Sequence, residues 1–114
     1  MDTKQHAAVL SIQDLVEAAH RNALEKGFWT VNKDVGNKVA LIHSELSEFF
    51  EAYRRDIIKP DEHCPKFTNI TIELADVLIR VFDLAGAMDI PLGEAVLAKM
   101  EYNQSRPYLH GKKF

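Results

Sequence analysis

The segment ELADVLIRVFD, residues 73–83, decides the fold class of this chain. Its ionisable side chains recur at steps of three, four and three, the spacing of one face of an α-helix, and they are Glu73, Asp76, Arg80 and Asp83. All the other side chains of the segment are apolar. A helix that is apolar almost all round is buried, so we expect this one at the centre of a helical bundle or in a subunit interface.

Apolar residues at helical spacing continue outward from this segment and predict further helices. The predicted helices span about residues 11–27, 34–55, 68–88 and 89–103. Ser11 and Asp89 are the expected N-caps of the first and the last helix. Between the second and third helices, IIKPDEHCPKF (57–67) holds two prolines and no period, which indicates a loop. The sequence therefore predicts an all-α fold, a four-helix antiparallel bundle that forms a homo-oligomer through its central helices.

With 114 residues, the chain has the usual length of one domain, and we expect a single domain whose ends, 1–10 and 106–114, are flexible. No apolar run approaches the roughly 18 residues of a membrane-spanning helix, and no signal peptide is recognisable. We therefore expect a cytoplasmic protein. Cys64 is the only cysteine, which excludes an internal disulfide and a thiolate metal cluster. The histidines that we assign to the surface are His6, His20 and His63.

A second acidic row precedes the loop, in ELSEFFE (45–51). Its first two acids, Glu45 and Glu48, are three residues apart, as are Glu73 and Asp76 in the following helix. On facing helices these four carboxylates would repel and raise one another's pKa values unless a cation lay between them. All-oxygen ligands suit Mg²⁺, or Mn²⁺ in its place. Iron fits less well, because di-iron bundles use a Glu-x-x-His pair on two helices where these rows have Glu-x-x-Glu and Glu-x-x-Asp.

Other interpretations of the charged residues stay open. The row that begins at Glu45 can be a solvated helix face, and the acids of residues 73–83 can belong to a buried salt-bridge network centred on Arg80. The acidic middle of the chain is followed by a basic end that includes Lys99 and Arg106. Both regions could serve one anionic ligand, the middle through a metal and the end directly, although a solvated tail would have the same composition.

The order of these motifs carries a resemblance to a known family. Glu45-x-x-Glu48 is followed, after 24 residues, by Glu73-x-x-Asp76, and the chain ends in KMEYNQSRPYLHGKKF (99–114). This pattern resembles the MazG-like superfamily of all-α nucleoside triphosphate pyrophosphatases, from about residue 28 to residue 114. The resemblance implies a helical bundle, assembly into dimers or tetramers, Mg²⁺ dependence, and hydrolysis of a (deoxy)nucleoside triphosphate to the monophosphate and pyrophosphate.

The resemblance also implies roles for particular residues. The implied metal ligands are Glu45, Glu48, Glu73 and Asp76. The implied phosphate-binding residues are Lys99, Asn103 and Arg106, and the implied base-binding residues are Phe28 and Trp29. The hydrolysis needs a base for the attacking water, and Glu45 or Glu48 is the expected catalytic carboxylate.

We expect a nucleoside triphosphate substrate, a role in nucleotide-pool housekeeping, and no nucleic-acid or membrane partner. Two other functions stay open. One is phosphoribosyl-ATP pyrophosphohydrolysis, which the same superfamily performs, and the other is a non-catalytic helical module whose acidic rows pair with basic residues of a partner. Trp29 can instead cover the end of the bundle, and the basic row can be a solvated helix end. Base and sugar preference also stay open, as does attack at the α or the β phosphorus.

Overall fold

The computed structural model describes residues 1–113, and every regular element within them is a helix. The elements in chain order are α1 (Thr3–Glu25), α2 (Phe28–Val31), α3 (Val35–Arg54), α4 (Asn69–Ala87), α5 (Leu92–Gln104) and the 3₁₀ helix η1 (Tyr108–Gly111). Between α3 and α4, Pro60 and Thr68 form an isolated β-bridge that extends into no strand. The all-α class predicted from the sequence is confirmed.

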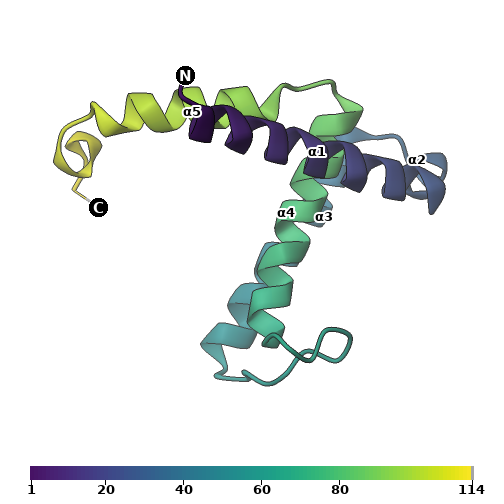
Figure 1. Cartoon of the computed structure of the whole chain (residues 1–114). Coiled ribbons are helices and arrows are strands. Elements are labelled where there is room, and N and C mark those ends of the chain that lie inside the picture. Colours follow the sequence, from purple (N-terminus) through teal and green to yellow (C-terminus); the bar gives the residue numbers. More distant parts are fainter. Residues whose placement is uncertain (114) are drawn as a thin grey trace.

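The helices pack as two pairs that meet at a crossing (Figure 1). α1 lies along α5 in one arm, α3 lies along α4 in the other, and α1 packs across α4. Two glycines allow α4 and α5 to pack closely against α1. A Cβ atom on Gly86 of α4 would lie 2.6 Å from the Cβ atom of His20 on α1, and one on Gly93 of α5 would lie 2.7 Å from the carbonyl oxygen of Val9. α1 therefore holds the two arms together through positions that exclude a larger side chain.

Each of the two helices that carry the acidic motifs begins at a residue whose side chain caps it. Asp34 is the N-cap of α3, and its side chain accepts a hydrogen bond from the backbone N–H of Asn37. Thr68 is the N-cap of α4 and accepts from the backbone N–H of Thr71. The observed bounds agree with the predicted ones to within about one residue, so the expected register of both acidic rows holds.

The first helix begins earlier than the sequence predicted. Asp2 and Gln5 form a capping box, in which each side chain binds the backbone N–H of the other residue, and α1 starts at Thr3. Ser11 is not an N-cap but lies inside α1, where its hydroxyl donates to the carbonyl oxygen of Ala7. Residues 3–10, which we expected to be flexible, form the first turns of α1.

The last part of the chain also differs from the prediction. Asp89 does not cap α5, because it adopts a left-handed backbone with φ of 53° in the connection before the helix. Pro91 takes the N-cap position, and no side chain caps this helix. Residues 106–114 were expected to be flexible; Tyr108–Gly111 form η1, whereas Phe114 lies outside the described residues.

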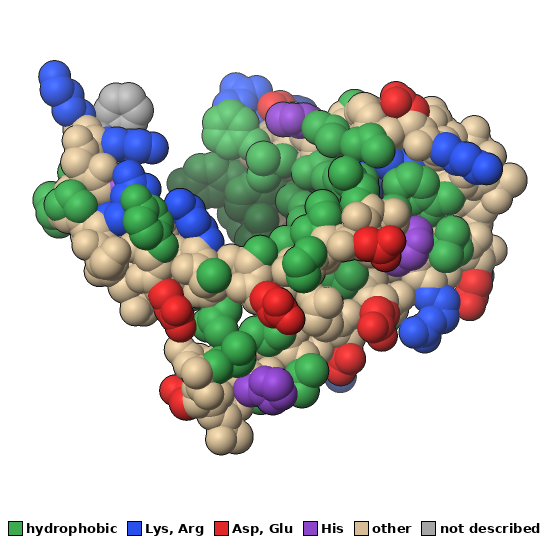
Figure 2. All heavy atoms as spheres, turned by 90° about the horizontal axis from the view of Figure 1, so that it is seen from above, with side chains coloured by type: hydrophobic (Ala, Val, Ile, Leu, Met, Phe, Trp, Pro, Cys, Tyr) green, Lys and Arg blue, Asp and Glu red, His purple; other side chains and the backbone are tan. Residues whose placement is uncertain are grey.

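Little of the apolar surface is buried within one chain. The buried hydrophobic residues are Val9, Val16, Ala23 and Ala85. A stripe along α3, which we call the α3 stripe, keeps between 41% and 61% of each residue exposed and consists of Val35, Val39, Leu46, Phe50 and Tyr53. Figure 2 shows hydrophobic side chains gathered in the hollow beside the C-terminal arm. The four-helix packing is therefore not complete within one chain and stays a prediction.

None of the helices formed by residues 1–113 is both long and apolar enough to cross a membrane.

Candidate functional site

Three of the four predicted metal ligands come together between α3 and α4. Glu45 lies in the middle of α3, and Glu73 and Asp76 lie in the first half of α4, one helical turn apart. One carboxylate oxygen from each of the three residues lies within 4.8 Å of the other two. All three residues are half-buried. We call Glu45, Glu73 and Asp76 the acidic cluster.

Glu48, the fourth predicted ligand, lies at the edge of the acidic cluster. It is one turn after Glu45 on α3, and its residue is exposed rather than half-buried. Its negative charge nevertheless acts on Glu73, because after burial it is the largest cause that raises the pKa of Glu73. Glu48 is therefore positioned beside the acidic cluster with its carboxylate open to solvent.

The electrostatics of the acidic cluster oppose its full ionisation. Burial raises the pKa of Glu73 above its ordinary value, and the charges of Glu48, Asp76 and Glu45 raise it further. Burial is also the main reason why the pKa of Asp76 is raised, with a contribution from Glu45 and a smaller one from Asp61 in the loop before α4. The neutral form of both carboxyl groups is thus favoured, and a cation bound between them would stabilise their ionised form.

Arg80 supplies one positive charge to this region. Its Nε donates a hydrogen bond of 2.9 Å to Oε1 of Glu45, and the two side chains are 31% and 16% exposed. Arg80 also lowers the pKa of Asp76 but does not overcome the effects that raise it. The ion pairs within residues 1–113 include neither Glu73 nor Asp76. The salt-bridge network that we considered around Arg80 thus reaches only Glu45.

A cavity of about 220 Å³ adjoins the acidic cluster. It lies between α1, α3 and α4, and we call it the interhelix cavity. Glu45, Asp76 and Arg80 line one part of its wall, and Phe28 and Lys38 line another. The wall of the interhelix cavity therefore combines charged groups with apolar side chains, among them Phe28 and Ile79.

The two predicted base-binding aromatic residues have different surroundings. Phe28 is half-exposed and faces the interhelix cavity. Trp29 is fixed by neighbours: its Nε1 donates a hydrogen bond of 2.8 Å to Oδ1 of Asp83, and the Nζ of Lys38 lies 4.5 Å from the centroid of its ring. Because one face of the indole is covered by Lys38, the arrangement leaves Phe28 as the freer stacking surface beside the acids.

The contacts that hold the end of α4 against α1 were not predicted from the sequence. Oδ1 of Asp83 accepts from Trp29 and also lies 2.9 Å from Nδ1 of His20, which is half-buried and not a surface residue as we had assigned it. Asp83 was visible as the last charge of the helical face in residues 73–83, but its partners are 54 and 63 residues away along the chain. Such long-range pairs leave no local signal.

The predicted phosphate-binding residues lie apart from the acidic cluster within one chain. Lys99, Asn103 and Arg106 lie in and just after α5, which packs against α1 and extends away from α4 toward the C-terminus (Figure 1). Lys99 and Arg106 lie over the ring of Tyr102, and Arg106 also donates to the carbonyl oxygen of His110. Oδ1 of Asn103 is buried without a hydrogen-bond partner. Their role in phosphate binding stays a prediction.

Comparisons with models of known protein families, with curated proteins and with solved structures found no match for this chain. The function is therefore inferred from the geometry of the site and from the sequence motifs.

Proposed function

We propose that this chain is a Mg²⁺-dependent nucleoside triphosphate pyrophosphohydrolase of the MazG-like superfamily, which converts (deoxy)nucleoside triphosphates to monophosphates and pyrophosphate. The observation that carries the proposal is the acidic cluster. Carboxylate oxygens of Glu45, Glu73 and Asp76 from two helices converge within 4.8 Å, and the ion pairs within residues 1–113 leave the last two without a cation. The order and spacing of the two Glu-x-x-acid motifs support the same assignment.

The donor set of the acidic cluster fits Mg²⁺. All three groups offer carboxylate oxygens, which hard divalent cations prefer, and Mn²⁺ would be accepted by the same ligands. Burial and the neighbouring carboxylates raise the pKa values of Glu73 and Asp76, and a bound cation would oppose both effects. When bound, Mg²⁺ supplies the positive charge that screens a triphosphate and lowers the pKa of a coordinated water.

The other residues of the site would have separate roles in the hydrolysis. Oε1 of Glu45 already accepts a hydrogen bond from Arg80, whereas Glu48 is exposed at the edge of the acidic cluster. Glu48 is therefore the better candidate for the base that accepts the proton of the attacking water. Arg80 has five N–H donors, of which Glu45 accepts the one on Nε, and its other donors are candidates for phosphate oxygens.

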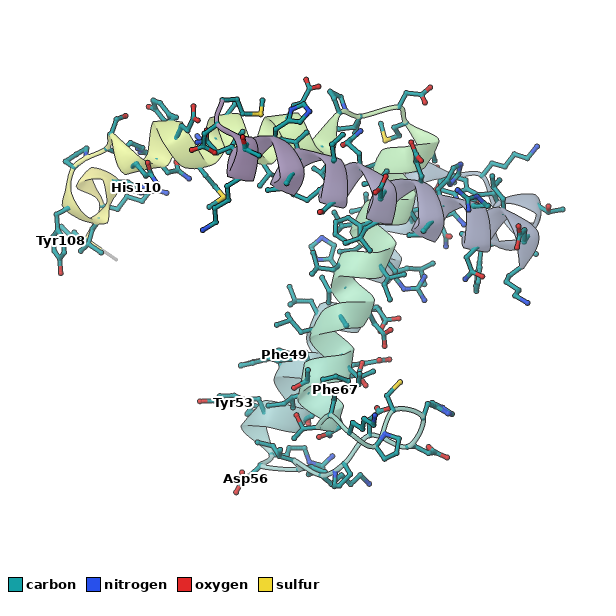
Figure 3. All side chains as sticks on the ribbon, viewed as in Figure 1. Phe49, Tyr53, Asp56, Phe67, Tyr108 and His110 are labelled. Atoms are coloured by element: carbon teal, nitrogen blue, oxygen red, sulfur yellow. The ribbon has the colours of Figure 1, made fainter. Side chains whose placement is uncertain are left out.

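A second copy of the chain is part of this proposal. The α3 stripe leaves large apolar side chains exposed, and Leu78 of α4 is 50% exposed as well. Figure 3 shows Phe49 and Tyr53 pointing from α3 to the side on which Tyr108 and His110 lie at the end of the other arm. A homodimer or homotetramer that covers this face would complete the four-helix packing and bring α5 of one copy toward the acids of another.

One observation favours a different function. The hydrogen bond from Arg80 to Glu45 is what a non-catalytic helical module would use to stabilise an acidic face without a metal. Such a module would release no pyrophosphate from any nucleotide, and Mg²⁺ would not stabilise it against unfolding.

The deciding experiment measures pyrophosphate release by the full chain from each ribo- and deoxyribonucleoside triphosphate, and from phosphoribosyl-ATP, with Mg²⁺ and with EDTA. We expect Mg²⁺-dependent release from triphosphates, and its loss in Glu73→Gln and Asp76→Asn. The matched control is Glu51→Gln, because Glu51 continues the acidic row of α3 but pairs with Arg54 at 3.0 Å outside the acidic cluster. Release from phosphoribosyl-ATP alone, or equal activity of all the variants, would overturn the proposal.

A further inference from the structure

Lys38 is the only charged residue of the described chain that is buried, with 7% of its surface exposed. It lies in the second turn of α3, and its Nζ donates a hydrogen bond of 2.8 Å to the carbonyl oxygen of Phe28. The same Nζ lies 4.5 Å from the ring centroid of Trp29. No carboxylate pairs with it among the ion pairs of residues 1–113. A buried ammonium held only by a carbonyl group and a ring face keeps part of its hydrogen-bonding capacity unused.

A purely structural role does not account for a charge at this position. Lys38 ties the start of α2, at Phe28, to α3, but an apolar side chain of the same length would fill the space without the cost of desolvating an ammonium. The side chain of Lys38 also lines the interhelix cavity, together with Glu45 and Asp76 of the acidic cluster. Its unused donor capacity is therefore available to a ligand in that cavity.

The position of Lys38 relative to the acidic cluster fits the nucleoside end of a nucleotide. Lys38 and Glu45 are seven residues apart on α3, or about 10.5 Å along the helix axis, and both line the interhelix cavity. The cavity of about 220 Å³ is smaller than the roughly 300–1,000 Å³ of pockets that enclose whole ligands, so it holds one part of a nucleotide. With the phosphates at the acidic cluster, that part is the base, with Phe28 as its stacking surface.

We infer that Lys38 selects the base of the substrate by donating a hydrogen bond to a carbonyl oxygen on its edge. This inference rests on the proposed function. An ammonium has three donors and no acceptor, so it complements the exocyclic oxygen of uracil, thymine or guanine and opposes the amino group that cytosine or adenine presents at the same position. Asp83, which also lines the cavity, offers less to an amino group, because its Oδ1 already binds His20 and Trp29.

The test is base discrimination in wild type and in variants of Lys38. We expect the wild type to have a kcat/KM at least about tenfold higher for UTP than for CTP and for GTP than for ATP. In Lys38→Met both ratios fall to about one, mainly through loss of activity on UTP and GTP, and Lys38→Arg keeps part of the preference. Lys4→Met, at an exposed lysine near the start of α1, is the matched control and leaves the ratios unchanged.

Other outcomes overturn the inference. A wild type that prefers neither UTP over CTP nor GTP over ATP overturns it. So does a Lys38→Met variant that loses activity equally on all four nucleotides, which is the behaviour of a structural residue. If Lys38→Met does not fold, the wild type alone decides: 4-thio-UTP, whose sulfur is a weaker acceptor, must be a poorer substrate than UTP. Equal kcat/KM for the two would exclude the hydrogen bond.

A separate measurement distinguishes failure of this inference from failure of the proposed function. Calorimetric titration with UMP and CMP in EDTA requires neither hydrolysis nor metal. If the wild type hydrolyses no triphosphate but binds UMP more tightly than CMP, and Lys38→Met abolishes the difference, the proposed activity fails and the inference about Lys38 stands. If hydrolysis occurs without any preference at Lys38, the activity stands and the inference fails.

Discussion

The Nε of Arg80 on α4 donates a hydrogen bond of 2.9 Å to Oε1 of Glu45 on α3, which makes Arg80 the internal counter-ion of the acidic cluster. The pair links the two helices, and both residues line the interhelix cavity. It compensates one of the three carboxylates and leaves Glu73 and Asp76 with raised pKa values. Arg80 and a divalent cation would therefore both compensate negative charge of the acidic cluster.

Replacement of Arg80 by Met should destabilise the protein most when Mg²⁺ is absent. In EDTA, the loss of a charged hydrogen bond leaves Glu45 uncompensated, and we expect the free energy of unfolding in urea to fall by about 1–2 kcal/mol. Saturating Mg²⁺ should reduce this loss, because the cation compensates the same carboxylate. Arg54→Met is the control, since its pair with Glu51 is exposed and should contribute at most about 0.5 kcal/mol. If the free energy of unfolding falls equally with and without Mg²⁺, Arg80 and the cation do not compensate the same carboxylate.

The pH dependence of stability should reveal the uncompensated carboxylates. Glu73 and Asp76 have folded-state pKa values above the ordinary 4.5 and 3.8, so the folded protein binds more protons than the unfolded chain just above those values. Their contribution to the free energy of unfolding therefore falls as the pH rises from the ordinary toward the raised pKa values, and the penalty is complete above them.

The measurement compares wild type with the double variant Glu73→Gln and Asp76→Asn in EDTA between pH 3 and pH 8, as an approximate range that brackets both ordinary pKa values. We expect the variant to become more stable than wild type as the pH rises, and Mg²⁺ to remove that advantage at neutral pH by stabilising only the wild type. A difference between the two proteins that did not change with pH would contradict the raised pKa values.

The sequence predicted most where the chemistry is local. Apolar residues at helical spacing predicted both helices, and the three-residue spacing within each acidic pair indicated the faces that carry the acids. The capping box of Asp2 and Gln5 is a local signal too, but it was not recognised, and the predicted helix start at Ser11 was wrong. Contacts between distant segments were not predictable: that Arg80 pairs with Glu45 depends on how α3 and α4 pack, 35 residues apart, and spacing along one helix gives no information about it.

The exposed apolar face of α3 predicts how the protein associates. Phe50→Arg places a charge in the middle of the α3 stripe, where Phe50 is 58% exposed in the single chain. If a second copy covers this stripe, the substitution should weaken self-association at least about 100-fold, as loss of a central apolar contact does. Leu15→Arg, at an exposed leucine of α1, is the control for an added charge. Sedimentation or light scattering gives the mass, and an unchanged mass for Phe50→Arg would place the interface elsewhere.

Arg106 should affect substrate binding more than turnover. Its guanidinium lies near the ring of Tyr102 and donates to the carbonyl oxygen of His110, so it is already held just beyond the end of α5, without a carboxylate partner among residues 1–113. We expect Arg106→Ala to raise KM about tenfold with kcat changed much less, because a contact to a remote phosphate is made in both the ground state and the transition state. Arg55→Ala, at the exposed end of α3, is the control. An unchanged KM would remove Arg106 from the site.

The separation of the basic row on α5 from the acidic cluster predicts complementation between two inactive variants. One variant carries Glu73→Gln, and the other carries Ala at positions 99, 103 and 106. If the α5 end of one copy serves the acids of another, a mixed dimer holds one site with both functional parts, and random exchange of subunits should restore about a quarter of the wild-type activity. A mixture of Glu73→Gln and Asp76→Asn is the control and should stay inactive, because both changes affect the acids of their own chain. If the first mixture also stays inactive after exchange has been verified by mass, the basic row does not act across copies.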